Sequence, residues 1–266
     1  MRHTIALGLR LLARALLPLL LLAPLLIFVL HAFSVRWFYP QLLPQEWTLE
    51  PLRRQLGSPQ VRSALLESLG IALTASGLSL LLGYPAARAL VLRNPPGARL
   101  IELLLFLPTI VPPVAVGLGL NILFLRLGLA GTRLGVVLVH LIPVLPYTIF
   151  SLTGVLARYD QGYEQQALVL GAGPARIFAT ITLPLLLPGL AVAGLLAFLV
   201  SWSQYLLTLL IGGGRVITLP LLLFSAVSGG NLTTIAILSL LFVAPPLAAI
   251  LLALRLLGGG RPMLAY

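Results

Sequence analysis

Long charge-free stretches are the feature that most limits what this 266-residue chain can fold into. A helix needs about 20 apolar residues to cross the hydrocarbon core of a bilayer, and the chain offers six such runs between its charged residues. Charged residues make up only 9% of the chain, against about a quarter in soluble domains. This excludes a soluble enzyme, a nucleic-acid-binding module and a disordered tail. We predict an all-α integral membrane protein with six transmembrane helices, at 15–33, 68–87, 103–125, 134–157, 185–209 and 232–254.

The same runs give the predicted layout of the chain. Residues 1–14 form an N-terminal segment, 15–257 a single transmembrane domain and 258–266 a tail. The first run could instead be a signal peptide, but it is too long and no small-residue cleavage site follows it. Ten arginines lie on the side of the termini and seven on the other, which favours cytoplasmic termini. Val216–Val227 is too short to cross and is predicted to be re-entrant or interfacial.

All 17 basic residues are arginine, and the chain has no lysine. Arginines at helix ends meet phospholipid headgroups, so we expect the membrane to be their partner and no nucleic acid. A Walker A loop holds phosphates with a lysine, so this chain cannot contain an ordinary ATPase site. There is no cysteine, and the three histidines are widely separated. We therefore predict no metal site and no cofactor, and His140 is interpreted as a neutral packed side chain.

The stretch 158–184, between the fourth and fifth predicted helices, is the longest polar segment on the side of the termini. Glu164–Leu170 favours a short helix, and Gly171 is placed to end it because glycine adopts the left-handed conformation at a helix C-terminus. Pro174 suits the first turn of a second short helix that runs to Thr182. The sequence therefore predicts a rigid two-helix hairpin in the cytoplasm. An ordinary loop between two spans is the alternative.

This stretch resembles the EAA loop of binding-protein-dependent ABC importer permeases, whose pattern is E-A-A-x3-G-x9-I-x-L-P. Gln165-Gln166-Ala167 stand three residues before Gly171, and nine residues separate that glycine from Ile181-Thr182-Leu183-Pro184, where the chain is expected to turn into the fifth span. The resemblance covers about Ser63–Leu257. Gln165 occupies the position of the family glutamate, with Glu164 one place earlier. This departure leaves open whether Glu164 makes the ion pair that the family glutamate makes with its ATPase.

The resemblance implies a MetI-like transmembrane fold in the bacterial inner membrane and a division of labour among several chains. The permease would have no catalytic site. It would pair with a second permease subunit, identical or different, and would receive its solute from a periplasmic binding protein. Separate ABC ATPase subunits would bind the hairpin as a coupling element. The implied ATPase-coupling residues are Glu164, Gln165, Gln166, Ala167, Gly171, Ala172, Pro174, Ile181, Leu183 and Pro184.

The candidate solute path is uncharged. Every acidic residue lies near a helix end or in a loop, whereas an ion-coupled carrier usually buries an ionisable group in its path. An amide and an indole in the outer half of the fifth span need polar partners in lipid. The candidate path residues are Thr109, Asn121, Ser201, Trp202, Ser203, Gln204 and Tyr205.

Two other classes of function stay open at this stage: a secondary carrier or channel that acts without an ATPase, and a membrane scaffold without a pore. The outer segment from Arg36 to Trp47 is similar to that of the iron, polyamine and thiamine branches of the family. Family members of this size and loop type also include those for sulfate and molybdate, and this segment favours polyamines, ferric iron and thiamine. An ATPase gene and a binding-protein gene beside this one would favour the importer.

Overall fold

The computed structural model describes residues 43–258 without a break, together with 14, 16–17, 20, 22–34, 37 and 40–41. Most of the predicted N-terminal segment, residues 15, 18, 19 and 21 of the first predicted span, Arg36 and the tail after Gly258 lie outside the described residues. The elements of the described part are helices joined by turns and loops, with one isolated antiparallel bridge between Ser34 and Trp47. This confirms the predicted all-α class.

The helices follow the apolar runs because a backbone without access to water must satisfy its hydrogen bonds within its own segment. In chain order they are α2 (Glu50–Gly57), α3 (Pro59–Arg88), the π-helical turn η1 (Ala89–Arg93), α4 (Ala98–Ile110), α5 (Pro113–Arg126), α6 (Arg133–Leu156), α7 (Gly162–Val169), α8 (Pro174–Ile177), the π-helical turn η2 (Phe178–Thr182), α9 (Leu183–Trp202), α10 (Leu206–Gly212), α11 (Leu219–Gly229) and α12 (Leu232–Gly258).

Four helical runs in the described part are long and apolar enough to cross a membrane: Pro59–Arg93, Arg133–Leu156, Pro174–Trp202 and Leu232–Arg255. Helices α4 and α5 make a fifth span if the bent pair counts as one. In the region of the first predicted span, the structure describes a shorter apolar helix, Leu22–Ala32. Helix α11 is also short, with 11 residues, as predicted for the segment around Val216–Val227.

The third predicted span is not one continuous helix. Helices α4 and α5 meet at an angle of 99°, and Val111 and Pro112 between them are extended, with ψ of 133° and 128°. Two consecutive prolines supply no backbone donors, and each disfavours a helical conformation in the residue before it. The prolines therefore break this helix rather than merely bend it.

The fifth predicted span begins earlier and ends earlier than expected. The predicted turn at Leu183-Pro184 is wrong, because α8, η2 and α9 form one continuous helical run from Pro174 to Trp202. The π-helical turn η2 ends at Thr182, two residues before Pro184, and such a turn changes the hydrogen-bond pattern where proline cannot donate. The run stops at Trp202, and α10 begins only at Leu206.

The chain forms two compact units. One holds the described residues up to Ala64 together with Leu219–Pro245, and its apolar centre contains Ala32, Ala236 and Ile237. The other holds Leu65–Thr218 and the chain from Pro246 onwards.

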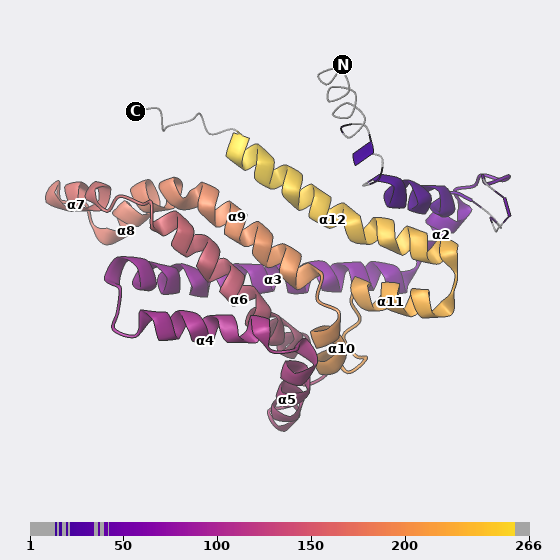
Figure 1. The fold of residues 1–266 in the computed structure, drawn as a ribbon, viewed down its shortest axis with the longest axis horizontal. Helices are drawn as coiled ribbons and strands as arrows, with labels where there is room; N and C mark the ends of the chain where they lie inside the picture. The colour runs from indigo at the N-terminus through magenta and orange to yellow at the C-terminus, as the bar shows by residue number, and fades with distance from the viewer. Residues whose placement is uncertain are drawn as a thin grey trace, which may run out of the picture. The chain divides into compact units, whose positions relative to one another are not determined.

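The functional argument concerns the second unit. Helices α6 and α9 pack along each other, and Leu152, Leu186 and Ala193 lie in their shared core. At one end of this pair lie α7 and α8, and at the other end lie α5 and α10 (Figure 1). A long pair of helices therefore connects a small hairpin to a cluster of short helices.

Candidate functional site

The corner between α7 and α8 is built by its glycine and its proline, as predicted. Gly171 has a φ of +83°, which only glycine adopts at low cost. The N–H of Ala172 donates to the carbonyl of Ala167 at 3.0 Å, and that of Gly171 donates to Leu168 at 2.9 Å. This pair of bonds is a Schellman motif, which satisfies the last carbonyls of a helix. Pro174 then starts α8, with Gly173 as its N-cap.

The tip of this corner is apolar and exposed. The exposed fractions are 55% for Leu168, 88% for Val169 and 87% for Leu170. Exposed apolar side chains are ordinary on a membrane-facing helix. These three instead lie between glutamines and the glycine corner, in the polar stretch 158–184. Leu168–Leu170 fall on the unspecified positions of the EAA pattern, so the pattern assigns them no role. Their signal was an apolar triplet within a polar segment.

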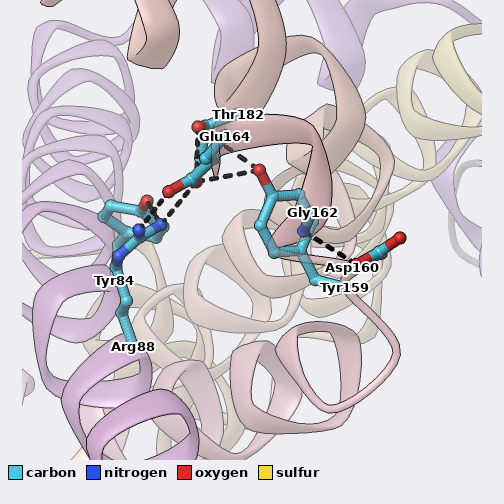
Figure 2. A network of polar contacts seen from close by, with 7 residues as sticks. All are labelled: Tyr84, Arg88, Tyr159, Asp160, Gly162, Glu164 and Thr182. Carbon is cyan, nitrogen blue, oxygen red and sulfur yellow. Dashed lines mark hydrogen bonds and ion pairs between the residues drawn. The ribbon is translucent and has the colours of Figure 1, made fainter. Parts of the chain in front are cut away.

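The N-terminal half of α7 carries a polar network around Glu164, shown in Figure 2. Arg88 donates to both carboxylate oxygens, from Nη1 to Oε1 at 2.9 Å and from Nη2 to Oε2 at 2.6 Å. Tyr159 donates to Oε1 at 2.8 Å and Thr182 donates to the same atom at 2.7 Å. Tyr84 Oη accepts from Arg88 Nη1 at 3.1 Å. One carboxylate thus joins α3, α7, the end of η2 and the segment after α6.

These contacts fix the charge of the carboxylate. The hydrogen bond from Arg88 lowers the pKa of Glu164 from 4.5 to about 2; burial opposes this, and Thr182 and Tyr159 add to it. The pKa of the Tyr159 phenol is raised, mainly by burial. Because the folded state has the lower carboxyl pKa, the stabilisation by this pair is fully present above pH 4.5 and is lost as the pH falls through about 2. Glu164 is therefore ionised at every physiological pH.

The predicted coupling residues divide between the two sides of the hairpin. Gln165, Gln166 and Pro174 are exposed, whereas Glu164 has a side chain only 14% exposed. The sequence left open whether Glu164 pairs with an ATPase, and in the structure its carboxylate is paired with Arg88 of the same chain. Of the remaining coupling residues, Ala167 is buried, Gly171 and Pro184 are exposed, and Ala172, Ile181 and Leu183 are half-buried.

Three of the predicted path residues, Ser201, Trp202 and Gln204, line one small internal space together with His140, and the other four are not part of its lining. Ser201 and Trp202 end α9 and are buried, and Ser201 Oγ lies 2.8 Å from Nδ1 of His140. His140 also contacts Thr208 on α10, with 2.9 Å between Nε2 and Oγ1. This confirms His140 as a packed residue and places Ser201 in the interior of the unit.

The other path candidates lie on the short helices and at the break. Ser203, Gln204 and Tyr205 occupy the break between α9 and α10 rather than a continuous helix. Asn121 on α5 donates from Nδ2 to the carbonyl of Leu210 at 2.6 Å, so it fastens α5 to α10. Thr109 is exposed on α4 and donates to the carbonyl of Phe106. Among the described residues, no group of three or more histidine, aspartate or glutamate side chains could hold a metal ion.

The hairpin and the two long apolar helices on either side of it lie within a stretch that a protein-family model matches. The model of the binding-protein-dependent transport system inner membrane component matches residues 79–258, which include α6, the hairpin and α9. The chain belongs to this family. The permease is thus a multi-pass protein of the inner membrane and a transport subunit of an ABC importer.

Two relatives show how far the similarity extends. The permease is 35% identical to the molybdenum transport system permease protein ModB of Mycobacterium tuberculosis over 193 residues, 67% of this chain and 71% of that protein. It is 31% identical to the putative 2-aminoethylphosphonate transport system permease protein PhnV of Salmonella typhimurium over 223 residues, 83% of each chain.

A solved structure shares the fold. It is a bacterial ABC transporter involved in the import of the acidic polysaccharide alginate, with a TM-score of 0.74 and 17% identity, covering 96% of this chain and 97% of that one.

Proposed function

We propose that the permease works with separate ABC ATPase subunits, and that the hairpin Gly162–Thr182 is the element that docks on them. The observation that carries this proposal is the apolar tip Leu168–Leu170, which is exposed at a rigid glycine corner. The absence of lysine from the chain agrees with ATP hydrolysis on another subunit. In this arrangement Gln165 and Gln166 lie on the exposed face of the docking helix, and Glu164 does not.

The tip supplies the binding free energy in this proposal. Burying a valine or leucine side chain contributes about 1.5–3 kcal/mol, so a charge at the centre of the tip should remove most of the attraction. We expect Val169→Asp to weaken retention of the ATPase by the detergent-solubilised permease at least about tenfold. The measurement is the amount of ATPase that co-purifies with the tagged permease from cells that express both genes.

Leu127→Asp is the matched control, since Leu127 is also an exposed apolar residue but lies beyond the opposite end of α6. It should retain the ATPase as the wild type does. Equal retention by Val169→Asp and the wild type would contradict docking through the tip.

The solute arrives, in this proposal, from a periplasmic binding protein. Molybdenum and 2-aminoethylphosphonate, named for the two relatives, join ferric iron, polyamines and thiamine as candidates. A thermal-shift screen of the periplasmic binding protein that delivers solute to the permease would assign the cargo, because a ligand at 100 times its Kd stabilises a protein by about 2.7 kcal/mol. No shift with any of the five would exclude them all.

A further inference from the structure

The carboxylate of Glu164 carries an inference that rests on the proposed function and deepens it. Its four donors come from Arg88, which contributes two, Tyr159 and Thr182. A carboxylate accepts about four hydrogen bonds, and this one already accepts four from its own chain, three at Oε1 and one at Oε2. These contacts point to a role within the chain.

The network gives the hairpin its link to α3. Along the chain, the hairpin is connected directly to α6 before it and to α9 after it. Arg88, at the end of α3, is 76 residues away in sequence and contacts the hairpin through Glu164. Arg88 is itself held by Tyr84, one turn earlier on α3, whose ring lies 5.8 Å from that of Phe178. The contact is bidentate, and a bidentate arginine–carboxylate pair fixes orientation as well as distance.

We infer that Glu164 and Arg88 are positioning residues that make the hairpin and α3 move as one body, so that a displacement of the hairpin by the ATPase reaches α3 directly. A flexible connection would let the hairpin tilt on its docking partner while α3 stayed in place. The partial burial of the pair supports a stiff link, since Glu164 is 14% and Arg88 33% exposed at the side chain, and buried pairs are screened less by salt and water.

The test separates docking from transmission. Glu164→Gln keeps the shape of the side chain but removes its charge. Arg88→Lys keeps the charge but loses the guanidinium that donates to both carboxylate oxygens. In proteoliposomes that contain the complete complex, we expect both variants to retain the ATPase and its basal hydrolysis. Solute moved per ATP hydrolysed should fall about tenfold, within the range of about 5- to 150-fold that is typical of coupling between sites.

The matched controls are Glu102→Gln and Arg93→Gln. Both residues are exposed, and neither forms an ion pair within the described part of the chain. Transport per ATP should be unchanged in both. The double variant Arg88→Glu with Glu164→Arg restores the opposite charges and should recover part of the lost coupling, which a simple folding defect at either position would not allow.

A direct readout uses the absence of native cysteine. Spin labels at Leu66→Cys on α3 and Val169→Cys on the hairpin occupy exposed positions in the same unit. Their distance distribution should stay narrow and unchanged between nucleotide-free and ATP-bound complexes, and should broaden with Glu164→Gln. The label at Val169 requires a first check that the ATPase is still retained; where it is not, Gln166→Cys takes its place.

Failure of the proposed function and failure of this inference would give different results. A wild-type permease that never retains an ATPase would refute the proposed function. A working complex in which Glu164→Gln transports with wild-type yield and leaves the label distances unchanged would overturn the inference on its own.

Discussion

At the scale of single residues, two glycines of the hairpin face open space but stand in different backbone conformations. A Cβ built on Gly171 or Gly173 meets nothing within 4 Å. Gly171 has a φ of +83°, whereas Gly173 has a φ of −70° and a ψ of 158°, which any residue adopts. The need for glycine at position 171 therefore comes from the backbone alone.

This difference gives a matched pair of variants. Gly171→Val should destabilise the corner by about 1–3 kcal/mol, because a β-branched residue is strained at positive φ. Amide exchange in the peptide covering 162–172 should then be faster by about tenfold or more, with the protein still inserted in the membrane. Gly173→Val should exchange like the wild type. Equal exchange in the two variants would mean that the corner does not depend on the left-handed residue.

Local signals were enough to predict the corner but not the direction of Glu164. Gly171 and Pro174 are read from the few residues around them, and both take the predicted roles. The orientation of Glu164 depends on Arg88, 76 residues earlier, and no local pattern contains that contact. The position of a polar side chain on a short helix is decided by its distant partner.

At the scale of helices, the prolines were visible in the sequence, but their effect depended on packing. The break at Pro112 is stabilised by contacts of α5 with α10, including the bond from Asn121 to Leu210. Pro184, by contrast, lies within a continuous run, two residues after the end of the π-helical turn η2. Two similar sequence signals thus gave a break in one place and continuity in the other. Four of the predicted spans have helical counterparts over most of their length. The third is divided because its prolines break the helix.

The contact of α6 with α9 depends on one small residue. A Cβ at Gly189 would lie 2.6 Å from Cγ2 and 2.7 Å from Cγ1 of Val155, and a β-branched side chain has little freedom to move. Gly189→Ala should therefore lower the free energy of unfolding by about 1–3 kcal/mol. The measurement is thermal unfolding of the permease in detergent.

Two variants control this prediction. Gly154→Ala, on the exposed face of α6 with nothing within 4 Å of its Cβ, should leave the unfolding midpoint unchanged or raise it slightly. Adding Val155→Ala to Gly189→Ala should recover stability, because it removes the obstructing methyl groups. A double variant no more stable than Gly189→Ala would show that the two side chains are not in conflict.

At the scale of the whole molecule, the orientation in the membrane follows from the second unit. Helix α6 has 24 residues, which gives a length of about 36 Å, enough to cross the hydrocarbon core. The turn between α5 and α6 lies at its first end, and the hairpin follows its last. The proposed docking on an ATPase places the hairpin in the cytoplasm, so the turn should face the periplasm.

Single cysteines test this orientation on a background that has none. Leu127 and Val169 are 60% and 88% exposed and lie beyond opposite ends of α6. With a membrane-impermeant maleimide, Leu127→Cys should be labelled in spheroplasts and Val169→Cys only in inverted vesicles. Because the wild type has no thiol to react, any signal comes from the introduced residue. Labelling of both positions from one side would contradict a membrane-spanning α6, and labelling with the two sides exchanged would place the hairpin where no cytoplasmic ATPase could reach it.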